Sequence, residues 1–230
     1  MEDIRAHISV AVLDVYERPL NVNVPVMCLD ERPCYLIGDA REVIPAKPGQ
    51  LARFDYEYVR NGTATVFGLF APLLGWQEMI VTERRTRIDF AGCLKRLVDE
   101  FYPSAEWIVV VLDNLNTHSK ASLYKALTPE EARRVAAKLE FHHTPKHGSW
   151  LNAVEIEFAA LTEQYQRIHG FLCLDRRIAS LAMLRSEVVA WTVERNSRVV
   201  KVNWLFRSVD ARVKLVKLYP ANQSGQISRA

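Results

Sequence analysis

Two continuous apolar runs stand out in the chain, and each ends in an aspartate. Residues 107–113 have the sequence W-I-V-V-V-L-D, and residues 26–30 have the sequence V-M-C-L-D. Apolar runs of this length without polar alternation are typical of strands buried on both faces of a sheet. The pattern therefore predicts two interior strands, with Asp30 and Asp113 at their carboxyl ends.

Spacing and composition predict the remaining elements. Residues 63–70 and 76–82 are rich in β-branched and aromatic residues and flank a short Gly- and Pro-containing connection, so they predict a hairpin. Ser149 is placed to cap a helix that follows it. Periodic apolar positions predict helices over 8–16, 87–101, 119–126, 129–139, 150–168 and 174–194, while composition predicts a strand over 140–144 and a loop or arm over 38–62.

The order of these elements predicts a mixed α/β sheet flanked by helices. Strands that are apolar throughout need helices on both faces of their sheet. We expect this domain to span residues 26–196, after an N-terminal helix and linker over 1–25 and before a basic C-terminal extension over 197–230. Ligand sites in such sheets lie at the carboxyl ends of parallel strands, where both aspartates are predicted.

The composition favours a globular protein of the cytoplasm. Of the 230 residues 49% are apolar and 25% are charged, which is ordinary for a soluble domain. No stretch approaches the roughly 18 apolar residues needed to cross a bilayer, and the acidic first residues do not resemble a signal peptide. The four cysteines are scattered and form no C-x-x-C pair, so we expect reduced thiols. Together with the missing span and signal peptide, this predicts a cytoplasmic location and no membrane partner.

The net charge of +3 does not by itself indicate a ligand. The distribution of charge is more informative, because one segment near the C-terminus holds many cations and a single acid, Asp210. The sequence leaves two interpretations open, a solvated surface or a flank that contacts phosphates. The cations are Arg195, Arg198, Lys201, Arg207, Arg212, Lys214 and Lys217.

The two aspartates are the strongest candidates for chemistry. If their strands are parallel neighbours, the two carboxylates emerge side by side, and a divalent cation would relieve their repulsion. A third acid on a later helix would complete a site for two ions about 3.5–4 Å apart. Each aspartate could instead only cap a turn.

The third acid is ambiguous from periodicity. Glu155 and Glu157 both lie in the helix predicted over 150–168, on either side of its apolar stripe near Val154 and Phe158. On a wheel of about 100° per residue both positions flank this stripe. Helical spacing alone does not choose between them.

Three blocks of sequence resemble a known family. Residues 26–31 (V-M-C-L-D-E), 110–118 (V-V-L-D-N-L-N-T-H) and 144–158 (T-P-K-H-G-S-W-L-N-A-V-E-I-E-F) resemble the DDE transposases of bacterial insertion sequences related to the mariner superfamily. Residues 53–62 and 210–215 resemble one bacterial branch of it. The resemblance implies a ribonuclease-H-like fold for the catalytic domain.

The same resemblance implies the active-site residues and their cofactor. Asp30 and Asp113 would be the first and second acids, and Glu155 would be the third, with Glu157 as the alternative. They would bind Mg²⁺ or Mn²⁺, as two ions, and act on double-stranded DNA at transposon ends and target sites. Further contacts with DNA or with the active site are expected from Asn114, His118, Lys146 and His147.

Members of that family usually carry a helix-turn-helix region before the first catalytic strand. Because Asp30 lies so near the start, we expect that region to be missing here, or encoded elsewhere.

Three functions follow as hypotheses. The first is a transposase that cleaves and joins DNA, with a homodimer as partner. The others are a regulatory fragment without catalysis and a ribonuclease-H-like nuclease without strand transfer.

Overall fold

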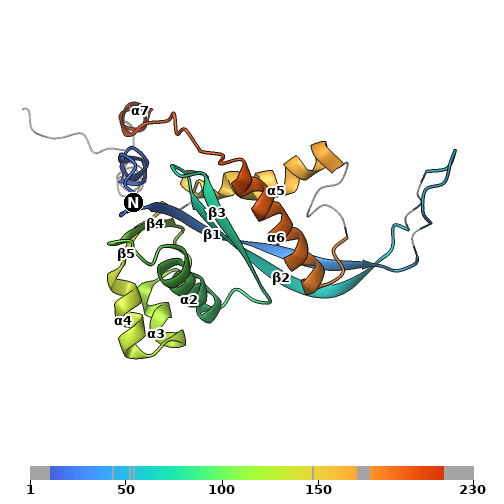
Figure 1. Ribbon diagram of the computed structural model, residues 1–230, viewed down its shortest axis with the longest axis horizontal. Coiled ribbons are helices and arrows are strands. Elements are labelled where there is room, and N and C mark those ends of the chain that lie inside the picture. The colour runs from blue at the N-terminus through green and yellow to red at the C-terminus, as the bar shows by residue number, and fades with distance from the viewer. Residues whose placement is uncertain are drawn as a thin grey trace, which may run out of the picture.

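A five-stranded mixed sheet forms the centre of the computed structural model (Figure 1). The structure describes residues 11–42, 44–51, 53, 55–146, 148–169 and 177–214, without the side chains of 163–169, 212 and 214. The strands lie in the order β3-β2-β1-β4-β5; the pairs β3–β2 and β2–β1 are antiparallel, and the pairs β1–β4 and β4–β5 are parallel. Their bounds are Val26–Asp39 for β1, Tyr58–Ala71 for β2, Trp76–Thr82 for β3, Ile108–Leu112 for β4 and Leu139–His143 for β5.

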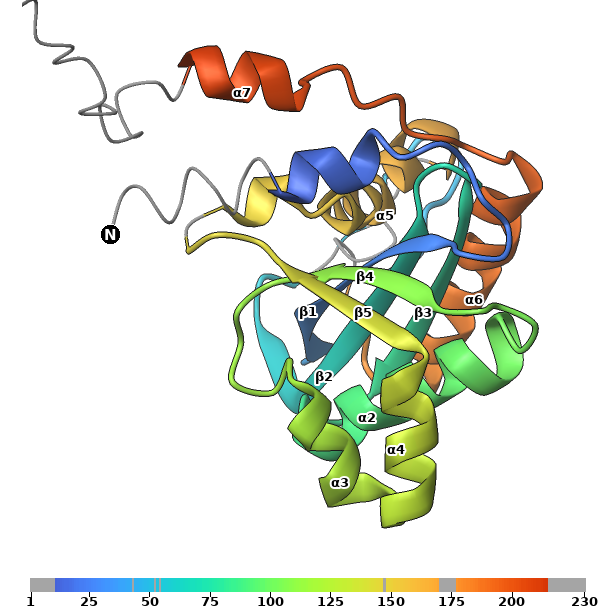
Figure 2. The same ribbon diagram turned by 90° about the vertical axis from the view of Figure 1, so that its left-hand side faces the viewer.

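Helices cover both faces of this sheet, as its apolar strands require. Figure 2 shows α2, α3 and α4 on one side of the sheet and α5 on the other. Helix α2 continues directly into a π-helical turn, and α3 is preceded by a 3₁₀ turn. The bounds are Arg87–Arg96 for α2, Leu97–Phe101 for the π turn, Lys120–Ser122 for the 3₁₀ turn, Leu123–Ala126 for α3, Pro129–Ala137 for α4, Val154–His169 for α5, Leu181–Ser197 for α6 and Ser208–Lys214 for α7.

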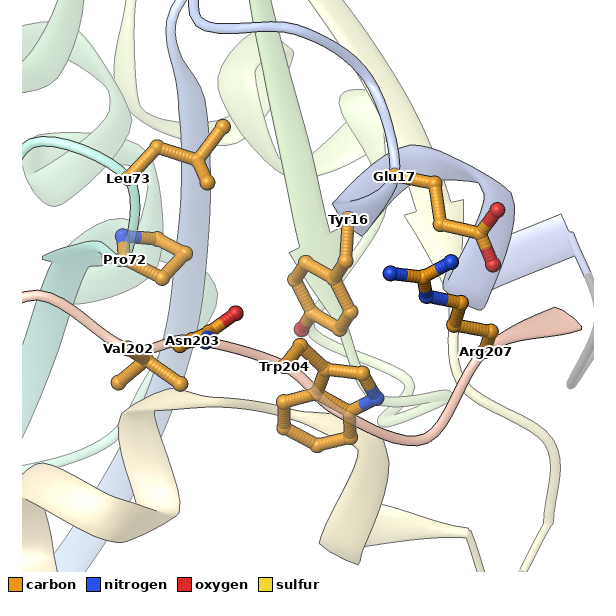
Figure 3. Close-up of a pocket in the computed structure, with 8 residues that line it drawn as sticks. All are labelled: Tyr16, Glu17, Pro72, Leu73, Val202, Asn203, Trp204 and Arg207. Carbon is orange, nitrogen blue, oxygen red and sulfur yellow. The ribbon is translucent and has the colours of Figure 1, made fainter. Parts of the chain in front are cut away.

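The N-terminal helix packs into the same core as the sheet. Residues 11–16 are helical, and Val12, Leu13 and Val15 are buried. The ring of Tyr16 lies against Trp204, which belongs to the segment that leads to α7 (Figure 3). Both ends of the described chain therefore contribute to the packing around the sheet.

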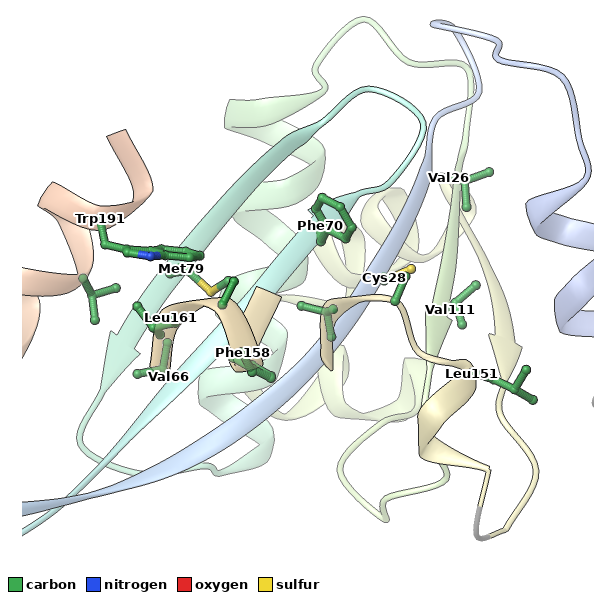
Figure 4. Close-up of a cluster of buried hydrophobic side chains, with 14 of the residues drawn as sticks. Val26, Cys28, Val66, Phe70, Met79, Val111, Leu151, Phe158, Leu161 and Trp191 are labelled. Atoms are coloured by element: carbon green, nitrogen blue, oxygen red, sulfur yellow. The ribbon is translucent and has the colours of Figure 1, made fainter. Parts of the chain in front are cut away.

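Alternation along β4 divides the core into two layers. Val109 and Val111 lie on the side of the sheet that α5 covers, in the cluster that also holds Phe158 and Trp191 (Figure 4). The neighbouring residue Val110 faces α2 and α4 instead. Successive side chains of a strand point to opposite faces, so a strand buried on both sides is apolar at every position.

The predicted mixed α/β fold is confirmed, and most predicted elements occur where expected. The helix over 87–101, the hairpin at 63–82 and the strand over 107–113 are all present. Two helix starts follow local signals. Thr86 forms a capping box with Asp89, and Thr128 caps α4 with Pro129 in its first turn.

The prediction for residues 26–62 was partly wrong. β1 does not end at Asp30 but continues to Asp39, and β2 begins at Tyr58 rather than at residue 63. The two strands pair from Cys28 with Phe70 to Asp39 with Tyr58, and beyond the end of β4 they form a two-stranded ribbon. We call residues 31–64 the β-arm; Leu36 and Ala64 in its base pack in one core with Leu184 of α6, and Figure 1 shows its far end extending beyond the helices. Long-range pairing here outweighs the turn-forming residues that suggested a loop.

Two helices begin later than predicted. A 3₁₀ turn occupies Ser149–Leu151 and α5 starts at Val154, so Ser149 does not cap it. Residues 177–180 are not helical, and α6 begins at Leu181 with Ser180 as its cap. The predicted residues 174–176 and 8–10 lie outside the described residues. Helix α7 was not predicted at all.

No helix in the described ranges combines the length and the apolar character that a membrane span needs. Cys28, Cys34 and Cys93 are free thiols, while Cys173 falls outside the described residues.

Candidate active site

The sheet places Asp30 and Asp113 at the same level of neighbouring strands. β1 and β4 are parallel, and Cys28 pairs with Val111. Asp30 lies two residues beyond Cys28 in β1, and Asp113 directly follows the last residue of β4. By alternation Asp30 has the parity of the residues that face α5. The topology thus brings the two predicted acids together.

A glycine lets α5 approach the sheet beside Asp30. Gly68 of β2 pairs directly with Asp30. A Cβ atom at Gly68 would come within 2.7 Å of Val154 Cγ2 and 2.9 Å of Phe158 Cζ. Because these two residues lie on either side of Glu155, their close packing on Gly68 carries the exposed Glu155 toward Asp30.

Asp30 is buried and surrounded by negative charge. Its residue is 7% exposed. Burial raises the pKa of the Asp30 carboxyl to about 7; the charges of Asp113, Glu155 and Glu31 also raise it, whereas the hydrogen bond from the Glu31 backbone lowers it. Asp113 and Glu155 are therefore close enough to act on Asp30 electrostatically.

Asn152 fixes the orientation of Asp30. Its side-chain nitrogen donates to the Leu29 carbonyl oxygen at 2.8 Å and to Asp30 Oδ2 at 3.2 Å. Asn152 is fully buried and lies just before α5, so the strand that carries Asp30 is joined to the helix that carries Glu155. The other oxygen, Asp30 Oδ1, accepts the backbone N–H of Glu31 at 2.8 Å.

Asp113 is held by His118 and by its own turn. His118 Nδ1 lies 2.5 Å from Asp113 Oδ1, and the backbone N–H of Leu115 donates to the same oxygen at 3.0 Å. Burial alone would raise the pKa of Asp113, but the hydrogen bonds from His118 and Leu115 outweigh burial and lower it.

The far side of the His118 ring meets a second carboxylate. His118 Nε2 lies 2.9 Å from Glu31 Oε2, although the two atoms are not aligned as a hydrogen bond. Burial would lower the pKa of His118, yet Asp113 and Glu31 raise it to about 9. The ring therefore lies between two acidic side chains, which favour its protonated form.

Glu157 has a different environment from Glu155. It is fully buried, and its two oxygens accept from Arg195 Nε at 2.8 Å and Arg195 Nη2 at 2.9 Å. This two-pronged ion pair joins α5 to α6 and satisfies the Glu157 carboxylate. Glu155 is exposed instead, and its charge acts on Asp30.

The other residues predicted to contact DNA or the active site differ in their exposure and hydrogen bonding. Asn114 donates from its side chain to the Thr144 carbonyl oxygen at 2.5 Å, so its amide joins two loops. His118 is 2% exposed and lies behind Asp113 rather than at the surface. Lys146 is exposed, and His147 lies outside the described residues.

The basic C-terminal segment is partly neutralised. Arg195 pairs with Glu157, and Arg198 pairs with Glu194 within α6. Lys201 and Arg207 are exposed. The side chains of Arg212 and Lys214, and the whole of Lys217, lie outside the described part, so a phosphate-contacting flank stays a prediction.

Sequence reasoning missed Glu31 and Asn152 as site residues. Glu31 follows Asp30 directly, so its own strand position predicts a side chain on the opposite face of the sheet. Asn152 is an amide in an otherwise apolar stretch, and buried polar groups are rarely without a partner. The strand position of Glu31 and the isolated amide of Asn152 are both visible in the sequence. Neither of them predicts the contact with His118 or with Asp30.

The donor set fits a divalent metal ion. Buried carboxylates that raise one another's pKa are stabilised by a hard cation with oxygen ligands. Within the described ranges, no three ligand side chains lie close enough together to hold an ion as they stand.

A cavity lies apart from these acids. It has a volume of about 310 Å³ and includes none of Asp30, Asp113 and Glu155 in its wall (Figure 3). The carboxylate site is thus a feature of the sheet edge rather than of this cavity. The residues that line this cavity are Tyr16, Glu17, Pro72, Leu73, Val202, Asn203, Trp204 and Arg207.

Comparison with solved structures finds the same fold in mariner transposases. The Mos1 mariner paired-end complex with Mn matches with a TM-score of 0.56 and 14% identity, covering 94% of this chain and 62% of that chain. The catalytic domain of Mos1 mariner transposase matches with a TM-score of 0.54 and 10% identity, covering 94% and 93% of the two chains. The chain therefore spans about three fifths of the longer Mos1 chain, and the ribonuclease-H-like fold is confirmed.

Sequence comparison identifies the family. No curated protein sequence matches the chain. The model of the family described as DDE superfamily endonuclease matches residues 25–176, which contain both strand-end aspartates and Glu155. Because this match covers more than half of the chain, the protein belongs to the DDE superfamily endonuclease family.

Proposed function

We propose that the chain is the catalytic domain of a transposase that cleaves DNA strands and transfers them to a target. The observation that carries the proposal is that Asp113 and Glu155, from separate elements, lie close enough for their charges to act on buried Asp30, in a member of this endonuclease family. Asp113 directly follows β4, the parallel neighbour of β1, and Gly68, which pairs with Asp30, admits Val154 and Phe158 of the helix that carries Glu155.

Divalent metal ions are part of the proposal. The three acids would hold Mg²⁺ or Mn²⁺, as two ions, and the ions would activate a water or a 3′-hydroxyl and stabilise the leaving oxygen. A solved Mos1 paired-end complex is described with Mn, which supports this metal class.

The chain's own residues position the acids for this chemistry. Asn152 donates to Asp30 Oδ2, and His118 and Leu115 engage Asp113 Oδ1. Glu155 is exposed at the start of α5, where it can reach a ligand outside the core. Buried Glu157 is committed to Arg195, so the geometry favours Glu155 as the third acid.

Double-stranded DNA is the proposed substrate. The solved Mos1 structures include a paired-end complex and a strand transfer complex. In this chain, the exposed Lys146 is the candidate phosphate contact. A homodimer remains a prediction.

The central test is replacement of Asp113 by Asn. This change keeps the size of the side chain but removes the charge that would bind metal. We expect Asp113→Asn to abolish Mn²⁺- or Mg²⁺-dependent nicking of supercoiled plasmid while thermal unfolding in EDTA shows that the fold is retained. His142→Gln is the control, since His142 pairs with Glu140 on β5 and should retain activity. Full nicking by Asp113→Asn would overturn the assignment.

The two other functions give different results in the same experiment. A regulatory fragment would bind no Mn²⁺ through the three acids and would not nick DNA. A nuclease without strand transfer would cleave but leave labelled 3′ ends unjoined to a target plasmid.

A further inference from the structure

We propose that Glu31 and His118 form a positioning pair that fixes Asp113 for metal binding. This inference rests on the proposed function, because it concerns how one of the three acids is oriented. Glu31 and His118 do not touch the ion themselves; they act through Asp113.

The His118 ring is clamped in one orientation. Its nitrogens lie 2.5 Å from Asp113 Oδ1 and 2.9 Å from Glu31 Oε2. One flat side of the ring stacks on Phe90 of α2, with centroids 4.6 Å apart and planes 30° apart. The side chains of His118 and Glu31 are 0% and 3% exposed, so solvent does not compete for these contacts.

The pair connects the two strands that carry the aspartates. Glu31 follows Asp30 in β1 and points to the α2 face, while Asp30 points to the α5 face. His118 follows β4 in the chain. It contacts Glu31 and Asp113 from the side of the sheet that α2 covers. A change in the position of one aspartate is therefore transmitted to the other through Glu31 and His118.

These contacts leave one carboxylate oxygen of Asp113, Oδ2, available to bind a metal ion. Both His118 and the Leu115 N–H act on Oδ1, and no hydrogen bond to Oδ2 occurs among the described residues. Groups behind a ligand carboxylate commonly set its orientation and its affinity for the metal. A buried carboxylate beside a buried imidazole with imperfect alignment costs stability, and a role in orienting Asp113 explains why the pair is present.

Two substitutions of His118 separate its two contacts. In His118→Asn the amide nitrogen lies near the position of Nδ1 and can still donate to Asp113. In His118→Gln the amide reaches toward Glu31 and leaves Asp113 Oδ1 without this donor. We expect His118→Gln to weaken Mn²⁺ binding about 10- to 100-fold, and His118→Asn to weaken it distinctly less.

Glu31 is expected to act on Asp113 through His118, while its charge also acts directly on Asp30. Glu31→Gln should weaken Mn²⁺ binding severalfold, and the loss in the double variant Glu31→Gln/His118→Gln should be smaller than the two single effects combined. Such non-additivity is the signature of residues that work as one unit. A purely structural role would lower stability in EDTA without separating the Asn variant from the Gln variant in Mn²⁺ affinity.

The measurement is Mn²⁺ affinity of the full chain, by electron paramagnetic resonance of free Mn²⁺, with urea unfolding in EDTA for stability. His142→Gln is a matched control, because His142 also pairs with a carboxylate, Glu140 Oε1 at 2.5 Å. It should bind Mn²⁺ as the wild type does. If both His118 variants fail to fold, Glu31→Gln decides: unchanged Mn²⁺ affinity in that variant would overturn the inference.

Asp113→Asn separates this inference from the proposed function. If Asp113→Asn loses Mn²⁺ binding but His118→Gln and His118→Asn bind as the wild type does, the positioning role is wrong and the metal site stands. If Asp113→Asn itself binds Mn²⁺ normally, the proposed metal site is wrong, and the positioning role falls with it.

Discussion

At the residue scale, Glu155 and Glu157 lie two positions apart on α5 and meet opposite environments. Glu157 is inside, paired with Arg195, whereas Glu155 is outside and acts on Asp30. Two residues along a helix correspond to about 200° of rotation. The same helix therefore presents one acid to the core and the other to the site.

This difference gives a stability prediction. Removing one partner of a buried ion pair leaves the other charge buried and costs about 3–5 kcal/mol. We expect Glu157→Gln to lower the free energy of unfolding by about this amount, because the buried ion pair between Glu157 and Arg195 is lost. Glu155→Gln, at an exposed position, should stay within about 0.5 kcal/mol of the wild type.

Urea unfolding in EDTA measures both variants without metal. Equal losses of stability in the two variants would contradict the assignment of a structural role to Glu157 and a site role to Glu155.

The sequence predicts Asp30 and Asp113 as catalytic acids but does not choose the third acid. Both aspartates end apolar runs, which is a local signal. The choice between Glu155 and Glu157 depends on Arg195, which lies on another helix. No local pattern reports that partner, and only the family resemblance favoured Glu155.

At the scale of elements, the packing of α5 on β2 depends on the absence of a side chain at Gly68. Val154 and Phe158 of α5 fill the space that a Cβ atom would take. The position of α5, and with it that of Glu155, is therefore set by a residue of β2 directly opposite Asp30.

We expect Gly68→Ala to destabilise the protein and to weaken Mn²⁺ binding. The added methyl group would force α5 away from the sheet, and overpacking of this kind typically costs about 1–3 kcal/mol. Gly92→Ala is the control, since Gly92 lies in α2 with open space around its Cβ position. Alanine in a helix is favoured over glycine by about 1 kcal/mol, so this variant should be more stable. A Gly68→Ala protein as stable as Gly92→Ala would contradict the packing argument.

A charged network joins α2 and its π turn to α4. Asp99 accepts from Arg134 Nη1 at 2.6 Å, Arg134 Nη2 at 2.9 Å and Lys95 Nζ at 2.9 Å. The hydrogen bonds from Arg134 lower the pKa of Asp99 to about 2, with burial opposing them and Lys95 assisting. The carboxylate is therefore more acidic in the folded protein than in the unfolded chain.

Lowering the pH should remove the stabilisation that the ionised Asp99 carboxylate contributes to the fold. An aspartate with a depressed folded pKa stabilises the fold fully above its unfolded pKa of about 3.9, and the stabilisation is lost as pH falls towards 2. We expect Asp99→Asn to be less stable than the wild type by about 1 kcal/mol at pH 7, with the difference shrinking below pH 4. Urea unfolding at pH 7, 5, 4 and 3 follows it. Glu100→Gln, which loses one exposed pair with Arg96, is the control, and a difference for Asp99→Asn that does not change with pH would contradict the prediction.

Elements with a local signature were predicted, and those that depend on distant pairing were not. The strand over 107–113 and the helix over 87–101 have complete patterns of their own. The second half of β1 is strand only because β2 pairs with it. The delayed start of α5 arises because Asn152 is used to bind Asp30 and Leu29 rather than to extend the helix.

At the scale of the whole molecule, the N-terminal helix is joined through Tyr16 to the residues that precede α5. Its hydroxyl donates to the Leu151 carbonyl oxygen at 2.7 Å and accepts the Ala153 N–H at 3.2 Å. These two residues flank Asn152, the partner of Asp30. The division predicted at residue 26 therefore separates segments that share hydrogen bonds and a core.

We expect Tyr16→Phe to lower both stability and Mn²⁺ affinity. The buried polar groups of Leu151 and Ala153 would lose their partner, at a cost of about 1–3 kcal/mol, and Asn152 would be held less firmly. Urea unfolding and Mn²⁺ titration measure the two effects. Tyr124→Phe, at a half-exposed position on α3, should change neither. Normal Mn²⁺ affinity in a destabilised Tyr16→Phe protein would restrict the role of Tyr16 to packing.

The β-arm has a consequence for how this fold can vary. β1 runs without interruption from Asp30 to the arm, and its pairing with β2 shifts once, between Leu36 and Ile37, where Asn61 is the extra residue. Inserting one amino acid before that shift would exchange the two sides of the ribbon, whereas inserting two would preserve them. Natural length differences in relatives should therefore come in even steps near the catalytic strand and in steps of any size toward the tip.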